Sequence, residues 1–185
     1  AIFWSLASSK DVFTPKNNMT RDIDVLFIGN KYGIRGKIVD YLKKNKIKVQ
    51  CYGSGWSNGH ISAPEMAALS KRSKIILGVG AIGHSSDVYT LKLRDFDAPM
   101  SGALYITQRN PDLLNFFSEG NEIECYSTFK EALNKINYYL ENSFEREKIA
   151  NKGLEKCLSS YTWEGHLKKT FRKLGLITQK NLDTD

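Results

Sequence analysis

Apolar runs bounded by glycine or polar clusters recur along the chain up to residue 126, and they predict the strands of a sheet. The five candidate strands are residues 23–28, 47–52, 74–79, 103–107 and 122–126. Several are apolar on both faces, which is typical of parallel strands buried between two layers of helices.

Apolar residues at helical spacing occupy the intervals between these strands. The candidate helices are residues 34–45, 64–72, 91–100 and a short one at 112–117. Alternating strands and helices predict an α/β fold, a Rossmann-like doubly wound parallel sheet of about five strands with right-handed crossovers. Ligands of such sheets bind beyond the carboxyl ends of the strands.

After residue 126 the pattern is helical to the end of the domain. Thr128 precedes Glu131 by three residues, a spacing that predicts a capping box at the start of a helix. The expected buried face of that helix consists of Phe129, Leu133, Ile136 and Leu140. Two more C-terminal helices are expected, one at about 144–158 and one that starts near residue 162.

Length and composition favour one globular domain, because 41% of the 185 residues are hydrophobic and 25% are charged. We expect residues 1–20 to form an extended interdomain connector, 21–177 the domain, and 178–185 a frayed tail. The apolar opening, residues 1–7, is far shorter than a membrane helix and has no basic region before it. A cytoplasmic protein without a signal peptide or a membrane span is therefore expected.

The net charge of +7 permits a nucleic acid, an anionic membrane surface or a phosphorylated small molecule as the partner. Lysines mixed with acids along the helices make nucleic acid unlikely. Cys51, Cys125 and Cys157 are odd in number, far apart and without CxxC spacing, so we expect reduced, buried thiols and neither disulfides nor a zinc site. No cluster of metal ligands is apparent.

A glycine-rich turn follows the first strand, at Gly29, Gly33 and Gly36, and opens a helix. Backbone N–H groups and the helix dipole favour an anion at such a place, and Arg35 and Lys37 add positive charge. The spacing matches neither GxGxxG nor a P-loop, so a simple tight turn explains it about as well.

A second candidate site follows the third strand, where Gly80 lies in a long glycine-rich loop. Lys92, Arg94 and Asp97 stand beyond this loop at helical spacing, a set that suits a diphosphate held by cations and a ribose held by a carboxylate. The alternative is a surface ion pair between Arg94 and Asp97, which contributes little.

Histidines and aromatics give weaker signals. A role as catalytic base is unlikely for His84 and less likely for His60 and His166. Tyr52 and Trp56 flank a glycine pair after the second strand, where a ring could stack on a nucleobase. Packing in the core is the favoured reading of Trp56.

Taken in order, these segments resemble the C-terminal domain of group 1 glycosyltransferases, most closely the CgeB-like branch. The resemblance rests on residues 24–29 (DVLFIG), 51–56 (CYGSGW), 73–77 (SKIIL), 93–102 (LRDFDAPMSG), 111–113 (PDL) and 161–163 (YTW). It covers nearly the whole chain and implies half of a GT-B fold, with a nucleotide-sugar donor, no metal, and a separate N-terminal acceptor domain as partner.

The resemblance also implies roles for individual residues. Asp97 takes the ribose role, and Lys92 and Arg94 lie near the phosphates. Gly29, Arg35, Ser101 and Gly102 complete the expected donor site, with Tyr52 and Gly80 near the nucleobase. The family usually has Glu where this chain has Asp97, and an acid where it has Tyr89.

Two functional readings therefore follow. The leading one is donor-sugar binding in a glycosyltransferase, with Arg35, Lys92 and Arg94 stabilising the diphosphate leaving group and the base supplied by the absent domain. The alternative is a noncatalytic interaction module that kept the fold but lost the donor site.

Overall fold

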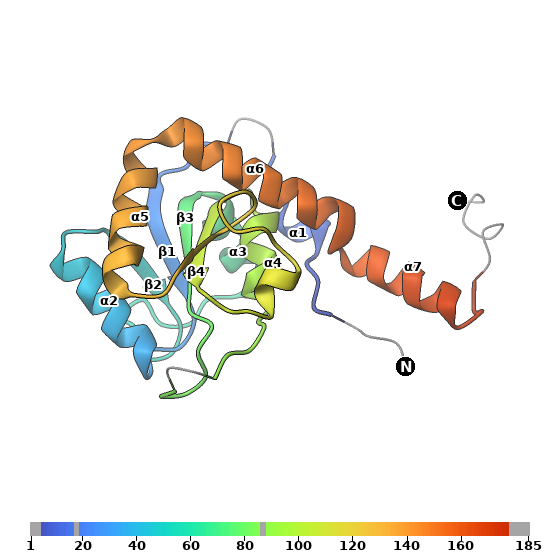
Figure 1. Cartoon of the computed structure of the whole chain (residues 1–185), viewed down its shortest axis with the longest axis horizontal. Coiled ribbons are helices and arrows are strands. Elements are labelled where there is room, and N and C mark those ends of the chain that lie inside the picture. Colours follow the sequence, from blue (N-terminus) through green and yellow to red (C-terminus); the bar gives the residue numbers. More distant parts are fainter. Residues whose placement is uncertain (1–4, 17–18, 86–87, 178–185) are drawn as a thin grey trace.

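A computed structural model describes residues 5–16, 19–85 and 88–177 (Figure 1). Its centre is a five-stranded, all-parallel sheet in the order β2-β1-β3-β4-β5. The strands are β1 (Ile23–Ile28), β2 (Val49–Tyr52), β3 (Ser73–Gly78), β4 (Leu104–Gln108) and β5 (Glu124–Tyr126). The predicted doubly wound parallel sheet is confirmed.

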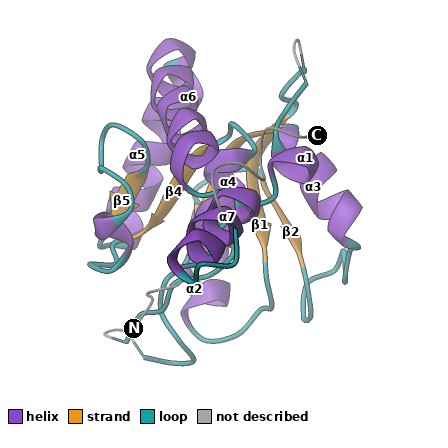
Figure 2. Ribbon diagram, turned by 90° about the vertical axis from the view of Figure 1, so that its right-hand side faces the viewer, coloured by secondary structure: helices purple, strands orange, loops and turns teal. Residues whose placement is uncertain are grey.

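Helices cover both faces of the sheet (Figures 1 and 2). They are α1 (Lys10–Phe13), α2 (Ile34–Lys44), α3 (Ala63–Lys71), α4 (Arg94–Met100), α5 (Phe129–Glu141), α6 (Ser143–Ser160) and α7 (Trp163–Lys173), with a 3-10 turn η1 (Leu113–Asn115). Two separate core clusters show the layering: α2 and α5 pack on one face, α1, α3 and α4 on the other. Helix α6 contacts both α4 and α5.

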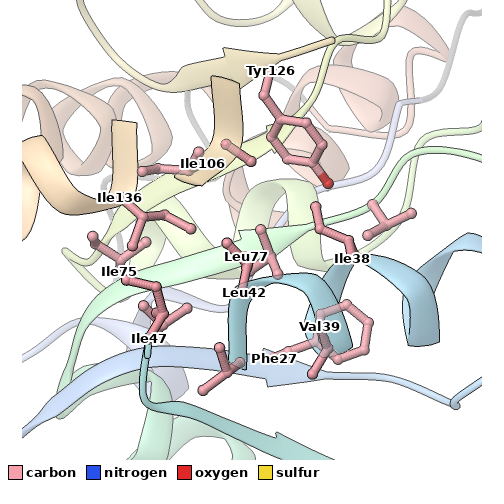
Figure 3. Close-up of a cluster of buried hydrophobic side chains, with 14 of the residues drawn as sticks. Phe27, Ile38, Val39, Leu42, Ile47, Ile75, Leu77, Ile106, Tyr126 and Ile136 are labelled. Carbon is pink, nitrogen blue, oxygen red and sulfur yellow. The ribbon is translucent and has the colours of Figure 1, made fainter. Parts of the chain in front are cut away.

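The larger core cluster explains why the apolar pattern predicts these elements. Phe27 of β1 and Leu77 of β3 point to the same face and are fully buried against Leu42 of α2 (Figure 3). Ile136 of α5 closes the cluster near β4. Burial of each such side chain contributes roughly 1.5–3 kcal/mol, so strands that are apolar on both faces belong in the middle of the sheet.

Several boundaries differ from the expectations. Strand β2 begins at Val49 because the Ile47 N–H still bonds the Leu42 carbonyl at the end of α2 (3.1 Å). Helix α4 begins at Arg94 and not at residue 91, and residues 112–117 form the turn η1 and not an α-helix. Within the expected extended connector, α1 is a four-residue helix that buries Phe13.

Capping side chains fix two helix starts. Ser62 and Glu65 form a reciprocal capping box at α3. At α5 the Thr128 hydroxyl accepts from the Glu131 N–H as expected, but the Glu131 carboxylate accepts from the Ser127 N–H (2.8 Å). The predicted reciprocal box at α5 is therefore replaced by two separate bonds.

The N-terminal segment and the last helix meet beside α4. Ser8 bridges to Thr162 in a parallel pairing, and its backbone bonds both Tyr161 and Trp163 (2.8 and 3.1 Å). From there α7 extends away from the sheet (Figure 1). This junction ties the start of the described chain to the α6–α7 corner.

Cys51, Cys125 and Cys157 are free thiols, and their expected burial is confirmed. Burial raises the pKa of Cys51 to about 11 and that of Cys125 to about 12. Neither thiol therefore forms a reactive thiolate near neutral pH.

Candidate functional site

The strand order places a switch point between β1 and β3. The chain leaves β1 towards β2 on one side and leaves β3 towards β4 on the other, so the loops beyond these two strands diverge. Ligands of open parallel sheets bind in the crevice that this divergence opens. Gly29 follows β1 at this point, and Gly80 lies just beyond the end of β3.

Three cations converge on the switch point. A Cβ built on Gly29 would lie 2.7 Å from Nη2 of Arg94 and 3.6 Å from Nη1 of Arg35, so both guanidinium groups border this glycine. The Lys92 ammonium donates to the Gly80 carbonyl (2.6 Å). Burial, with repulsion from Arg35 and Arg94, lowers the pKa of Lys92 to about 8.

The guanidinium groups retain unused donors. In the part of the chain that the structure describes, the buried side-chain nitrogens without a hydrogen-bond partner are Arg35 Nε, Arg94 Nη1 and Asn110 Nδ2. The Arg94 group lies over the Phe27 ring, 5.1 Å from its centroid. Buried donors without acceptors are rare, and those of the two guanidinium groups that border Gly29 suit a ligand with several anionic oxygens.

The nearby carboxylates do not neutralise these cations directly. Asp95 is buried and accepts from the Tyr105 hydroxyl (2.5 Å) and from the Lys92 N–H (2.7 Å), which holds the start of α4. Asp97 accepts from the Ser8 hydroxyl (2.7 Å), and burial raises its pKa to about 6. The described contacts contain no Arg94–Asp97 ion pair of the kind the alternative reading required.

A cavity of about 270 Å³ opens beside the cations. Lys92, Arg94 and Asp97 supply its charged lining, Ser70 adds a hydroxyl, and Phe13 and Met66 are among its apolar residues. Its volume is near the lower end for small-molecule sites, which are mostly apolar with a few placed polar groups. The cavity can therefore take a small flat group next to an anion.

The loop between β3 and α4 folds back as a short hairpin. Ala81 pairs with Tyr89, and the Thr90 N–H bonds the Gly80 carbonyl (3.2 Å). The hairpin touches the start of α2, because a Cβ on Gly33 would lie 2.2 Å from the Gly83 carbonyl oxygen. His84 is exposed beside this contact.

The structure brings Gly29, Arg35, Lys92, Arg94 and Gly80 together, with Asp97 on the adjoining cavity. Ser101 and Gly102 are not part of this cluster, since they follow the far end of α4. There the Gly102 carbonyl accepts from Arg21 (2.6 Å) and the Ser101 hydroxyl bonds Ala98. The seven residues of α4 carry the chain to the opposite edge of the sheet, where β4 begins.

The two aromatics after β2 differ in environment. Trp56 belongs to the core, as the favoured reading expects, and its indole N–H donates to the Gly29 carbonyl (2.7 Å). Tyr52 is partly buried against the second core cluster, and its hydroxyl donates to Gln50 (3.4 Å). Trp56 thus supports the turn that borders the cations.

Sequence reasoning missed Asn110, Ser8 and the apolar cavity lining. Asn110 carried a signal, because a polar residue two positions after a buried strand and just before Pro111 is placed at the carboxyl edge of the sheet. Ser8 carried none, since its contact with Asp97 joins residues that are distant in the chain. In residues 5–16, 19–85 and 88–177 no group of three His, Cys, Asp or Glu side chains could hold a metal ion, and none of the described helices is long and apolar enough to cross a membrane.

Comparisons place this fold and this chain among known proteins. A family model described as "Glycosyl transferase-like" matches residues 35–171. HepE of Anabaena, solved with UDP-glucose, superposes with a TM-score of 0.73 at 9% identity over 92% of this chain and 56% of HepE. The sucrose-phosphate synthase of Thermosynechococcus elongatus gives 0.67 at 12% identity over 91% of this chain and 51% of that one.

The C-terminal domain of the group 1 glycosyl transferase LpcC from Francisella tularensis gives a TM-score of 0.61 at 12% identity. It covers 84% of this chain, which spans 99% of that domain. The chain thus spans about half the length of the two longer proteins and has the fold of a GT-B C-terminal domain. Among curated proteins no sequence matches.

Proposed function

Because this chain belongs to the glycosyl transferase-like family, we propose that it binds a nucleotide-diphosphate sugar at the switch point of its sheet, as the donor half of a glycosyltransferase. The observation that carries the proposal is the set of unpaired guanidinium donors of Arg35 and Arg94 beside Gly29. A diphosphate supplies the acceptors that these donors lack.

Each part of the donor has a counterpart in the site. Arg35, Arg94 and Lys92 surround the diphosphate, and the cavity that Asp97 lines receives the nucleoside. Asp97 accepts from a ribose hydroxyl after exchanging its bond to Ser8. HepE, with the same fold, is solved with UDP-glucose, which makes UDP-sugars the first donors to test.

The cations also serve the chemistry. Sugar transfer leaves negative charge on the departing diphosphate, and fixed positive charge in a partly buried site stabilises it. Following the division of roles that the family resemblance implies, we assign the base that deprotonates the acceptor to a second, acceptor-binding domain. The length of this chain, about half that of HepE, agrees with such a division.

Two finer assignments complete the proposal. From the resemblance of segments 51–56 and 93–102 we propose that the chain belongs to the CgeB-like branch of the family. Its three unpaired thiols suit a reducing compartment, and we propose a cytoplasmic location. The alternative is a noncatalytic interaction module. It is supported by the Ser8 hydroxyl, which already donates to the Asp97 carboxylate that would bind the ribose.

Calorimetric titration of the chain with UDP, UDP-glucose, GDP and GDP-mannose tests the proposal. Arg94→Met removes a charged donor from the site and should weaken binding of the preferred nucleotide by about 10- to 100-fold, the value of a hydrogen bond to a charged group. Arg172→Met removes the same charge from an exposed position on α7 and should change the affinity by less than about twofold.

Two outcomes would contradict the donor site. One is that none of the four nucleotides binds the parent chain, which would favour the interaction module. The other is equal binding by Arg94→Met and Arg172→Met, which would place the nucleotide elsewhere on the surface.

A further inference from the structure

Contacts between side chains and backbone connect three neighbouring regions of the candidate site. The cavity lined by Asp97 comes first, and Lys92 and Arg94 form part of its wall. Lys92 then reaches Gly80, whose carbonyl accepts from the ammonium (2.6 Å). A Cβ on Gly80 would lie 3.6 Å from Cβ of Asn110, so Asn110 is the next residue beyond the cations.

The side-chain amide of Asn110 is held in one orientation, and its N–H donors have no hydrogen-bond partner in the described part of the chain. It is 2% exposed, at the start of the loop that follows β4. Its Oδ1 accepts from the Asp112 N–H (3.0 Å), and this bond fixes which end of the amide is nitrogen. Nδ2 has no partner among the described residues.

The other buried amide at this edge behaves differently. Gln108 is also buried, and its Oε1 accepts from the Ala81 N–H (3.1 Å), so it braces the hairpin after β3. Bracing of the loops is thus already supplied by Gln108. The unused donor of Asn110 calls for an acceptor from outside the chain, since buried donors are almost always satisfied.

We propose that Asn110 Nδ2 donates to a hydroxyl of the donor sugar and so helps to select and position it. This inference rests on the proposed function, because it takes the nucleotide sugar to be the ligand. A nucleotide sugar runs from nucleoside through diphosphate to sugar, the same order as cavity, cations and Asn110.

Charge explains why the sugar, and not the diphosphate, is the partner of Asn110. The anionic group is matched by the guanidinium and ammonium groups of Arg35, Arg94 and Lys92. A neutral amide next to them suits a neutral hydroxyl, and a site built to bond a hydroxyl discriminates strongly against ligands without it. Tyr89 lies on the same side of Gly80, with Cδ1 3.3 Å from the position of an added Cβ.

The test compares the affinities of the chain for UDP and for UDP-glucose by calorimetry, for the parent chain and for Asn110→Ala. Removing the amide should lower the affinity for UDP-glucose by about three- to tenfold, which corresponds to one neutral hydrogen bond. The affinity for UDP, which lacks the glucose, should change by less than about twofold. Asn115→Ala, an exposed amide in the same loop, should change neither affinity.

Asn110→Asp guards against a loss of the loop structure. This substitution keeps the oxygen that accepts from the Asp112 N–H but removes the amide donor. It should therefore lower the affinity for UDP-glucose more than the affinity for UDP. An unchanged ratio of the two affinities in both variants would overturn the inference while leaving the donor site intact. Failure of the parent chain to bind UDP would instead reject the proposed function, and this inference with it.

Discussion

The Lys92 ammonium lies near two guanidinium groups, and its lowered pKa reflects the free-energy cost of keeping it charged there. Burial, together with Arg35 and Arg94, brings that pKa from 10.5 to about 8. Between these two values the folded chain binds fewer protons than the unfolded chain, so the contribution of Lys92 to stability rises with pH across this window. Below about pH 8 the protonated lysine destabilises the free chain.

The same group should make donor binding depend on pH. A bound diphosphate favours the charged form of Lys92, so UDP-glucose affinity should fall as the pH rises from about 7 to 9.5. Calorimetry at several pH values would measure the slope. Lys92→Met should flatten it, whereas Lys44→Met, which changes an exposed lysine at the far end of α2, should leave it unchanged. A slope that persists in Lys92→Met would assign the pH dependence to another group.

Loop and helix meet closely where the β3–α4 hairpin rests on the start of α2. Gly33 has φ of +54°, a region that disfavours side chains, and an added Cβ would also lie 2.2 Å from the Gly83 carbonyl oxygen. Gly59 has a similar φ of +64° with nothing within 4 Å of an added Cβ. Gly33 also has ψ of −132°, outside the left-handed helical region, so its backbone and its contact both disfavour a side chain, whereas at Gly59 only the backbone does.

Gly33→Ala and Gly59→Ala should differ in stability for this reason. Gly59→Ala should cost about 1–2 kcal/mol, the price of a left-handed alanine. Gly33→Ala should cost a further 1–3 kcal/mol or so, because the hairpin must move to admit the methyl group. Urea unfolding followed by circular dichroism would measure both, and equal losses would mean that the hairpin does not rest on α2 in solution.

The elements that could be predicted from the sequence are those whose apolar pattern depends only on residues close together in the chain. Strand β1 is apolar except for Asp24, β3 contains the apolar run 75–77, and Gly29 marks the turn after β1. Ser101 and Gly102 were assigned to the site from their place in a motif, but the motif does not encode the direction of α4. The free amide of Asn110 depends on which neighbours use their donors, and that is known only after folding.

At the scale of the molecule, packing is uneven between the sheet and α7. Two large apolar residues at the end of α7 are exposed, Phe171 at 39% and the C-cap residue Leu174 at 55%. Phe117, by contrast, is 2% exposed and packs against Phe96 and Tyr161 under α4. Apolar rows of this kind on a projecting helix are typical of a surface that another domain or chain covers.

Truncating these two phenylalanines should therefore have opposite consequences. Phe117→Ala should lower the free energy of unfolding by about 3–5 kcal/mol because it opens a cavity in the core. Phe171→Ala should change it by less than about 1 kcal/mol. Thermal and urea unfolding of both variants measure this, and a loss at Phe171 as large as that at Phe117 would show that α7 belongs to the core of this chain.

The crowded cations beside Gly29 also mean that this sequence is locally frustrated. Replacing Arg35 or Arg94 with an apolar side chain of similar size would relieve repulsion and remove a buried donor without a partner, so the empty fold would gain from losing them. Folding and ligand recognition thus make opposing demands on the same few atoms. The free chain is the compromise between them, and a polyanionic ligand acts as the counter-ion that the fold itself does not provide.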